Sequence, residues 1–106
     1  MINTQLKKGL LDTCVLSTLA RGDSYGYQIL KDLPDSLDIS ESTLYPILRR
    51  LENGACVTAY SVEHEGRLRK MYAITDIGRQ QIQMFLADWR EVEEIYRYIE
   101  EEAANG

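Results

Sequence analysis

The chain has 106 residues, of which 44% are hydrophobic, and a net charge of −5. This length fits one domain with a modest core. It contains no apolar run near the roughly 18 residues that a membrane span requires. The first residues lack the organisation of a signal peptide. We therefore expect a cytoplasmic protein without a membrane partner.

The cysteine and histidine content argues against a metal site. Cys14 and Cys56 are far apart and form no CxxC pair, and His64 is the only histidine. Each cysteine is most simply a small buried hydrophobe, and a zinc site would need an unusual set of ligands. The sequence also lacks a recognisable nucleophile–base set and any GxGxxG or P-loop spacing. We expect no metal, no cofactor and no enzymatic activity.

The negative charge is concentrated at the end of the sequence. Residues 76–106 hold eight acidic residues and three arginines, which leaves nine residues of each sign in residues 1–75. Local charge matters more for DNA binding than the total does. The overall acidity therefore does not exclude a nucleic-acid partner for the first 75 residues.

Apolar residues at helical spacing predict a first helix over about residues 5–21. Its inward side is expected to contain Leu6, Leu10, Cys14 and Val15. A second strip of this helix carries no bulky side chain and consists of Gly9, Thr13 and Ser17. Such a strip suits close packing of a neighbouring helix or a shallow groove for a ligand, and packing is the simpler interpretation.

Two further helices follow. Asp23 or Ser24 is expected to cap a short second helix that turns Tyr27, Leu30 and Leu33 inward. The third helix is predicted over residues 41–53, between Ser40 as N-cap and Gly54 as terminator. Its buried face is predicted to consist of Leu44, Ile47, Leu48 and Leu51.

Pro46 lies inside the predicted third helix. A proline there cannot donate a hydrogen bond to the carbonyl group of Ser42. We expect this missing bond to produce a local 3₁₀ step or a kink between Glu41 and Pro46.

Residues 57–74 change to an alternating pattern. Gly66 supplies the positive φ of a tight turn, so the segment is predicted to be a β-hairpin with a basic second strand. Thr75 is expected to cap a final helix that runs to about residue 103.

The final helix carries an apolar heptad seam. The seam is formed by Ile82, Phe85, Trp89, Val92, Tyr96 and Ile99. One small domain cannot cover so long a seam, so we expect a second copy of the chain to cover it. The alternative is a helix that lies wholly on the core of its own domain. Leu86 and Ile95 widen the seam on the side expected to contact the first helix.

Two short helices joined by a turn and followed by a hairpin are the element order of a winged helix-turn-helix. We therefore predict an α+β, mostly α fold. Residues 1–75 would form a winged helix-turn-helix DNA-binding domain, and residues 76–106 a long C-terminal dimerisation helix.

The outer side of the third helix and the hairpin supply candidate DNA contacts. Those on the helix are Ser42, Thr43, Tyr45 and Arg49, and those on the hairpin are His64, Arg67, Arg69 and Lys70. Arginine can bind a guanine edge or a phosphate, and hydroxyl groups can bind phosphate oxygens. Taken one by one, these residues also fit a solvated helix face and a charged hairpin edge. Their combination in one fold favours DNA.

The segments "GDSYGYQIL", "STLYPILRRLENG" and "RKMYAITDIGRQQI" closely resemble the PadR family of transcriptional regulators. "FLADWREVEEI" resembles its small LmrR-like subfamily. The resemblance implies a homodimeric repressor that binds a palindromic operator and releases it when an effector binds. In that subfamily paired tryptophans flank a flat pocket at the dimer interface.

Trp89 matches this tryptophan. The resemblance therefore implies an effector site, for multidrug or phenolic ligands, that consists of Trp89, Phe85, Gly9 and Thr13, with the glycine-containing strip facing the partner's last helix. Phe85 is bulky enough to fill such a pocket. The alternative function is a protein-interaction module that pairs through residues 76–103 without a small-molecule effector.

Overall fold

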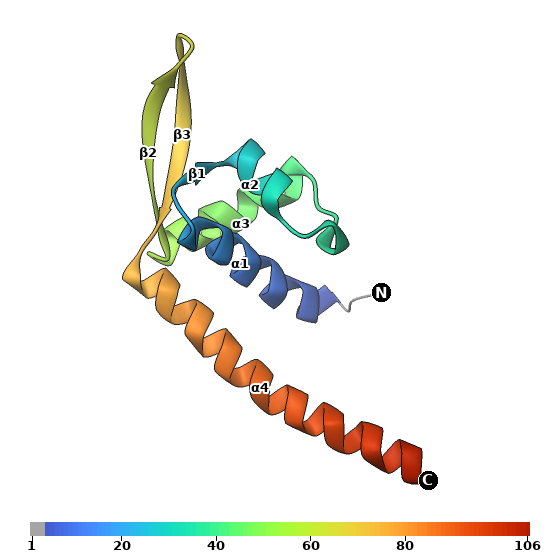
Figure 1. Ribbon diagram of the computed structural model, residues 1–106. Coiled ribbons are helices and arrows are strands. Elements are labelled where there is room, and N and C mark those ends of the chain that lie inside the picture. Colours follow the sequence, from blue (N-terminus) through green and yellow to red (C-terminus); the bar gives the residue numbers. More distant parts are fainter. Residues whose placement is uncertain (1–3) are drawn as a thin grey trace.

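The computed structural model describes the backbone of residues 4–106 and the side chains from residue 9 onward. The predicted Leu6 contact lies outside the described side chains. The elements, in chain order, are α1 (Thr4–Ala20), β1 (Ser24–Tyr25), α2 (Gly26–Asp32), the 3₁₀ helix η1 (Asp35–Leu37), α3 (Glu41–Asn53), β2 (Val57–His64), β3 (Arg67–Ile74) and α4 (Asp76–Asn105). Figure 1 shows α1, α2 and α3 gathered together, with the β2–β3 hairpin and α4 extending from them in different directions.

The hairpin forms the wing of a winged helix-turn-helix. Strands β2 and β3 pair antiparallel from Val57 opposite Ile74 to His64 opposite Arg67. The turn between them is made by Glu65 and Gly66, whose φ angles of 52° and 79° match the positive values that a two-residue hairpin requires. The predicted hairpin and its turn glycine are therefore confirmed.

A short third strand, β1, completes the sheet in the order β1-β3-β2. Ser24 pairs with Tyr72, and Tyr25 pairs with Met71. The pairing takes Ser24 into the sheet, so the N-cap of α2 is Tyr25. The prediction that Asp23 or Ser24 caps this helix was wrong.

The side of α2 that faces the core also differs from the prediction. Ile29 is fully buried, and Leu33 is buried as predicted. Tyr27, which we expected to face inward, is 56% exposed. Because α2 begins at Gly26, its inward stripe runs through Gly26 and Ile29, which turns Tyr27 outward.

Helix α3 has the predicted bounds, with Ser40 as its N-cap and Gly54 as its C-cap. Ser40 does not bond a backbone N–H group with its side chain; its Oγ lies 2.8 Å from the Oγ of Ser42. The helix is α-helical throughout and passes through Pro46 without a 3₁₀ segment. The predicted 3₁₀ step was therefore wrong.

One hydrophobic core lies under α3 and the sheet. The four predicted α3 residues are buried, and α1 contributes its own stripe. The buried apolar side chains are Leu11, Val15, Leu16, Leu19, Ile29, Leu33, Leu37, Leu44, Ile47, Leu48, Leu51, Cys56, Val57 and Tyr72. At about 1.5–3 kcal/mol for each large side chain, this burial is the main force that fixes α3 against the domain.

Helix α4 starts at a well-defined joint. Thr75 caps it as predicted, because its Oγ1 accepts a hydrogen bond of 3.1 Å from the backbone N of Gly78. From there α4 extends past the other helices and gives the molecule a longest dimension of 65 Å (Figure 1). None of the described helices is long and apolar enough to cross a membrane.

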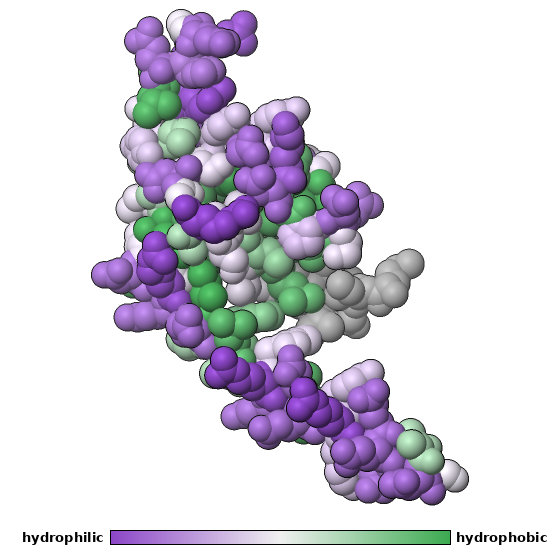
Figure 2. Space-filling model, in the orientation of Figure 1, coloured by the Kyte–Doolittle hydropathy of each residue, from purple (hydrophilic) through white to green (hydrophobic). Residues whose placement is uncertain are grey.

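The predicted seam of α4 divides into two parts. Ile82 packs on the domain core, and Phe85 and Trp89 are half-buried. Val92, Tyr96 and Ile99 are exposed. The visible face of the far part of α4 is mostly hydrophilic in Figure 2, as expected for an amphipathic helix.

The first part of α4 makes its contact with α1 in a way that the sequence did not predict. Leu86 and Ile95 are exposed, so the prediction that they face the first helix was wrong. Phe85 instead lies against α1 at Gly9. A Cβ atom placed on Gly9 would be 3.9 Å from the Cε2 atom of Phe85.

Candidate nucleic-acid interface

The outer face of α3 carries the polar residues predicted for DNA contact. Ser42 and Thr43 are exposed in its first turn, and Arg49 is exposed two turns later. Tyr45 is 43% exposed and leans toward α2. The buried leucines of α3 lie on the opposite side and hold this polar face outward.

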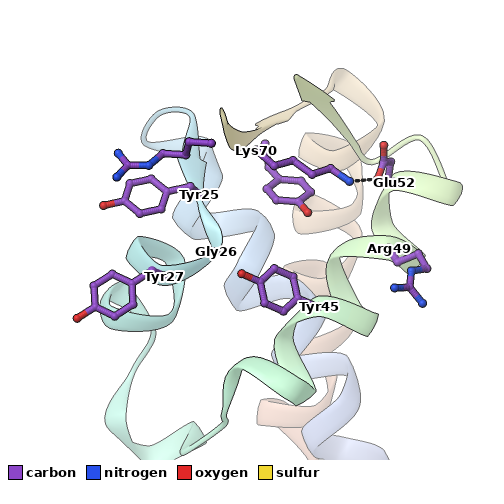
Figure 3. Close-up of a pocket in the computed structure, with 9 residues that line it drawn as sticks. Tyr25, Gly26, Tyr27, Tyr45, Arg49, Glu52 and Lys70 are labelled. Atoms are coloured by element: carbon purple, nitrogen blue, oxygen red, sulfur yellow. Dashed lines mark ion pairs between the residues drawn. The ribbon is translucent and has the colours of Figure 1, made fainter. Parts of the chain in front are cut away.

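A groove runs between the start of α2, α3 and strand β3, with a volume of about 370 Å³ (Figure 3). Its lining brings together four of the predicted residues, Tyr45, Arg49, Arg69 and Lys70. The other lining residues are Tyr25, Gly26, Tyr27, Glu52 and Tyr72. The groove therefore joins α3 to the basic strand of the wing.

Arg49 and Arg50 are adjacent in sequence but have different surroundings. The Arg50 guanidinium forms an ion pair with Asp12 of α1, which links α3 to the first helix. Arg49 forms no ion pair with a described residue, and Figure 3 shows its side chain pointing away from Tyr45. Arg49 is thus the arginine of α3 that is available for a phosphate or a base.

The basic residues of β3 are held in place by α3 and β1. The Nζ atom of Lys70 lies 3.8 Å from Oε1 of Glu52. The Arg69 guanidinium lies over the ring of Tyr25, 3.9 Å from its centroid. A cation placed over an aromatic ring is attracted to it and keeps its charge for a ligand.

His64 and Arg67 are not brought into the groove. They pair with each other across the end of the hairpin, beside the Glu65–Gly66 turn. The imidazole Nε2 of His64 lies 3.8 Å from Oε1 of Glu65. Hydrophilic side chains gather over this end of the wing in Figure 2, well separated from α3 in Figure 1.

Tyr25 and Tyr27 line the groove although neither was predicted from the sequence. The alternation of tyrosines around Gly26 in "SYGYQ" could have indicated them, since both lie where a strand is followed by a helix.

Another tyrosine, Tyr60, donates a hydrogen bond of 2.6 Å to Oδ2 of Asp23 across the sheet. This bond raises the pKa of Tyr60 above its ordinary value.

The residues predicted for an effector site lie together on α1 and α4. Phe85 and Trp89 stack with ring centroids 5.7 Å apart and nearly parallel planes. Gly9 lies next to the Phe85 ring, since a Cβ atom added to it would be 3.9 Å from Cε2 of Phe85. The Thr13 hydroxyl donates a hydrogen bond of 2.9 Å to the carbonyl oxygen of Gly9. The Phe85 ring of the chain's own α4 therefore approaches the strip on α1 at Gly9, which stays exposed.

Neither cysteine is among the residues predicted for DNA or for an effector. Cys56 is buried and Cys14 is half-buried, and both thiols are free. Burial raises the pKa of each thiol, so neither is activated for reaction.

Several proteins of known structure are similar to this chain. A transcriptional regulator from Clostridium thermocellum is 32% identical, with 92% of this chain and 96% of that one covered and a TM-score of 0.79. A Streptococcus transcriptional regulator is 27% identical, with 92% of this chain and 99% of that chain covered and a TM-score of 0.80.

Bacillus subtilis PadR, solved in complex with operator DNA, is 27% identical over 73% of this chain and 46% of that one, with a TM-score of 0.67. Residues 15–84 match the sequence model of the transcriptional regulator PadR-like family. That match spans most of the domain that carries α3 and the wing. The chain belongs to the PadR-like family of transcriptional regulators.

Proposed function

We propose that the protein is a dimeric repressor that binds a palindromic operator through α3 and the wing, residues 57–74. The observation that carries the proposal is the groove in which Tyr45 and Arg49 of α3 meet Arg69 and Lys70 of β3. A recognition helix flanked by cations matches the way winged helices dock into a major groove. Ser42 and Thr43 would bind backbone phosphates near the start of α3, and His64 and Arg67 would contact DNA at the wing tip.

The distribution of charge supports this assignment. The groove holds three cations against one carboxylate, Glu52. The excess acid lies in residues 76–106, on a helix that extends away from the groove (Figure 1). Phosphate would therefore meet the basic part of the molecule, and α4 would remain off the DNA. This division supports residues 1–75 as the DNA-binding domain and residues 76–106 as the dimerisation helix.

A second copy of the chain is the proposed cover for α4. Val92, Tyr96 and Ile99 are each 45–59% exposed on one side of the helix. Soluble proteins rarely leave so continuous an apolar stripe in water. A twofold dimer through α4 would carry two α3 helices, which suits half-sites about 10 bp apart or a multiple of that. The same stripe would suit a different partner protein, and a stable homodimer in solution would exclude that alternative.

Effector release is a further part of the proposal. The stack of Phe85 on Trp89 presents a flat aromatic surface beside Gly9 and Thr13. A planar apolar molecule would bind by replacing Phe85 on Trp89 or by covering the other face of the indole. Because Trp89 is the only tryptophan, quenching of its fluorescence by flat aromatic cations or phenolic acids tests this site directly. An unchanged spectrum across both classes would contradict it.

The main experiment is the selection of bound duplexes from random DNA by the full chain. We expect enrichment of an inverted repeat whose two halves are recognised equally. The Arg49→Ala protein, tested in parallel, should enrich no sequence or a degenerate one at the same salt concentration. If the wild-type protein enriches no motif, the proposed function is wrong.

A further inference from the structure

Two tyrosines beside the start of α2 each carry a cation over the ring, Arg69 of β3 over Tyr25 and Lys31 of α2 over Tyr27. Figure 3 shows the rings of Tyr25 and Tyr27 on the same side of the groove, with both hydroxyl groups turned the same way. The Arg69 guanidinium lies 3.9 Å from the centroid of the Tyr25 ring. The Nζ atom of Lys31 lies 5.2 Å from the centroid of the Tyr27 ring. We call these four residues the tyrosine–cation cluster.

The cluster has no internal anion. Neither Lys31 nor Arg69 forms an ion pair with a described residue. The nearby carboxylates are engaged elsewhere, because Asp23 accepts the hydrogen bond from Tyr60 and Asp32 accepts one from Gln28. The cluster thus offers two hydroxyl donors and two cations without an ion-pair partner among the described residues, which is the chemistry that binds a phosphate.

The cluster is also continuous with the groove. Tyr25, Tyr27 and Arg69 line it together with Arg49 and Tyr45 of α3. Figure 3 places Arg49 at one end and the two tyrosines at the other. A ligand that follows the groove past α3 therefore reaches the cluster next. A DNA strand offers a phosphate at each nucleotide and suits this arrangement better than a single small anion does.

We propose that the tyrosine–cation cluster binds a phosphodiester of the DNA strand that flanks the groove contacted by α3. Tyr25 and Tyr27 donate hydrogen bonds to the phosphate oxygens, and Lys31 and Arg69 neutralise the charge. The rings hold the two cations in place. The inference rests on the proposed function and extends it to Tyr25, Tyr27 and Lys31, none of which belongs to α3 or to the wing.

The hydroxyl groups can be tested without removing the rings. Tyr25→Phe and Tyr27→Phe each delete one neutral donor, and Tyr98→Phe is the matched control because Tyr98 is 62% exposed on α4. A hydrogen bond to a charged group is worth a factor of about ten or more in affinity. We expect each cluster variant to lose about tenfold on both the selected duplex and a scrambled one, since a phosphate contact carries no sequence information. The Tyr98→Phe protein should bind as the wild type does.

The cations give an independent readout. Lys31→Gln should reduce the slope of log K against log salt concentration by about 0.9 for each phosphate that the variant no longer neutralises. Tyr27→Phe should lower affinity and leave that slope unchanged, because no counterion is released at a hydroxyl group. Thermal unfolding of each variant shows that the fold is retained.

The outcomes separate this inference from the proposed function. If Arg49→Ala weakens operator binding while the tyrosine and lysine variants bind like the wild type, the cluster does not contact DNA and the inference is wrong. If the losses are confined to the selected duplex, the cluster acts through base reading and the phosphate assignment is wrong. If the wild-type protein binds no duplex above background, both proposals fail together.

Discussion

At the residue scale, two adjacent arginines on α3 have different surroundings. Arg50 is tied to Asp12, whereas Arg49 lies in the groove without an ion-pair partner among the described residues. Arg49→Ala should cost about 1–3 kcal/mol of binding free energy if the guanidinium reads a base. Arg50→Ala should leave base discrimination intact and lower the free energy of unfolding by at most about 1 kcal/mol, since the pair is partly exposed. Fluorescence anisotropy on labelled duplexes, with urea unfolding, measures both quantities. Equal losses of affinity for the two variants would contradict this division.

Gly26 offers a second prediction at this scale. A Cβ atom added there would lie 2.7 Å from the hydroxyl oxygen of Tyr45 and 3.0 Å from its Cζ. Gly26→Ala must therefore displace the Tyr45 ring, and we expect it to lower the free energy of unfolding by about 1–3 kcal/mol. The same change in a Tyr45→Ala background should cost much less, because the colliding ring is absent. An equal cost in both backgrounds, measured by urea unfolding, would show that Tyr45 is not the obstacle.

At the element scale, α4 starts at a closely packed joint with the wing. Thr75 Oγ1 accepts from the N of Gly78 and lies 2.6 Å from the carbonyl oxygen of Ala55, to which it donates. A Cβ atom on Gly78 would collide with the carbonyl oxygen of Cys56 and lie 2.7 Å from Cγ1 of Ile74.

Two substitutions test this joint. Thr75→Ala should cost about 0.5–2 kcal/mol of unfolding free energy through loss of the cap. Gly78→Ala should cost more, because the obstacle is backbone and cannot move aside. Thr58→Ala, at an exposed position of β2, is the control and should be close to neutral. Denaturant unfolding gives the three values, and a neutral Gly78→Ala would contradict the packing described for this joint.

The elements that could be predicted from sequence are those specified by local pattern. Helix α3 has its leucine stripe, its Ser40 cap and its Gly54 terminator in adjacent residues, and the hairpin has Gly66 at its turn. Strand β1 was missed because only pairing with Tyr72 and Met71, nearly 50 residues later, makes it a strand. The local pattern therefore could not show that α2 begins at Gly26 and turns Tyr27 outward.

The candidate site was predictable to the same extent. Tyr45 and Arg49 of α3 and Arg69 and Lys70 of β3, which line the groove, could be named from sequence because each pair follows from the period of its own element. The partner of Arg50 is 38 positions away, and the groove requires α2, α3 and β3 to be placed together. The 3₁₀ step expected near Pro46 did not form: α3 remains α-helical through it, on an exposed side of the helix.

At the scale of the whole molecule, α4 extends beyond the domain and leaves apolar side chains in water. If a second copy covers them, Val92→Glu should place a charge in the interface and give a monomer. Tyr98→Glu is the matched control, because Tyr98 is 62% exposed and helical spacing sets it on a different side of α4 from Val92, Tyr96 and Ile99. Sedimentation equilibrium should show a dimer for the wild type and the control and a monomer for Val92→Glu. A monomeric wild type at micromolar concentration would contradict the dimer.

The two ends of the molecule also divide its charge, with basic groups at the groove and acid on α4. This division predicts that binding to DNA is local to α3 and the wing and is strongly weakened by salt. An operator-binding regulator must also bind its own sequence more tightly than others, which a general electrostatic attraction would not provide.

The most direct measurement is the ratio of two equilibrium affinities at one salt concentration, for the duplex selected by the full chain and for a scrambled duplex of the same composition. Specific regulators exceed their non-specific binding by a factor of about 10³ or more. We predict a ratio in that range, reduced by Arg49→Ala. Equal affinities for the two duplexes would contradict the central claim that this protein recognises an operator.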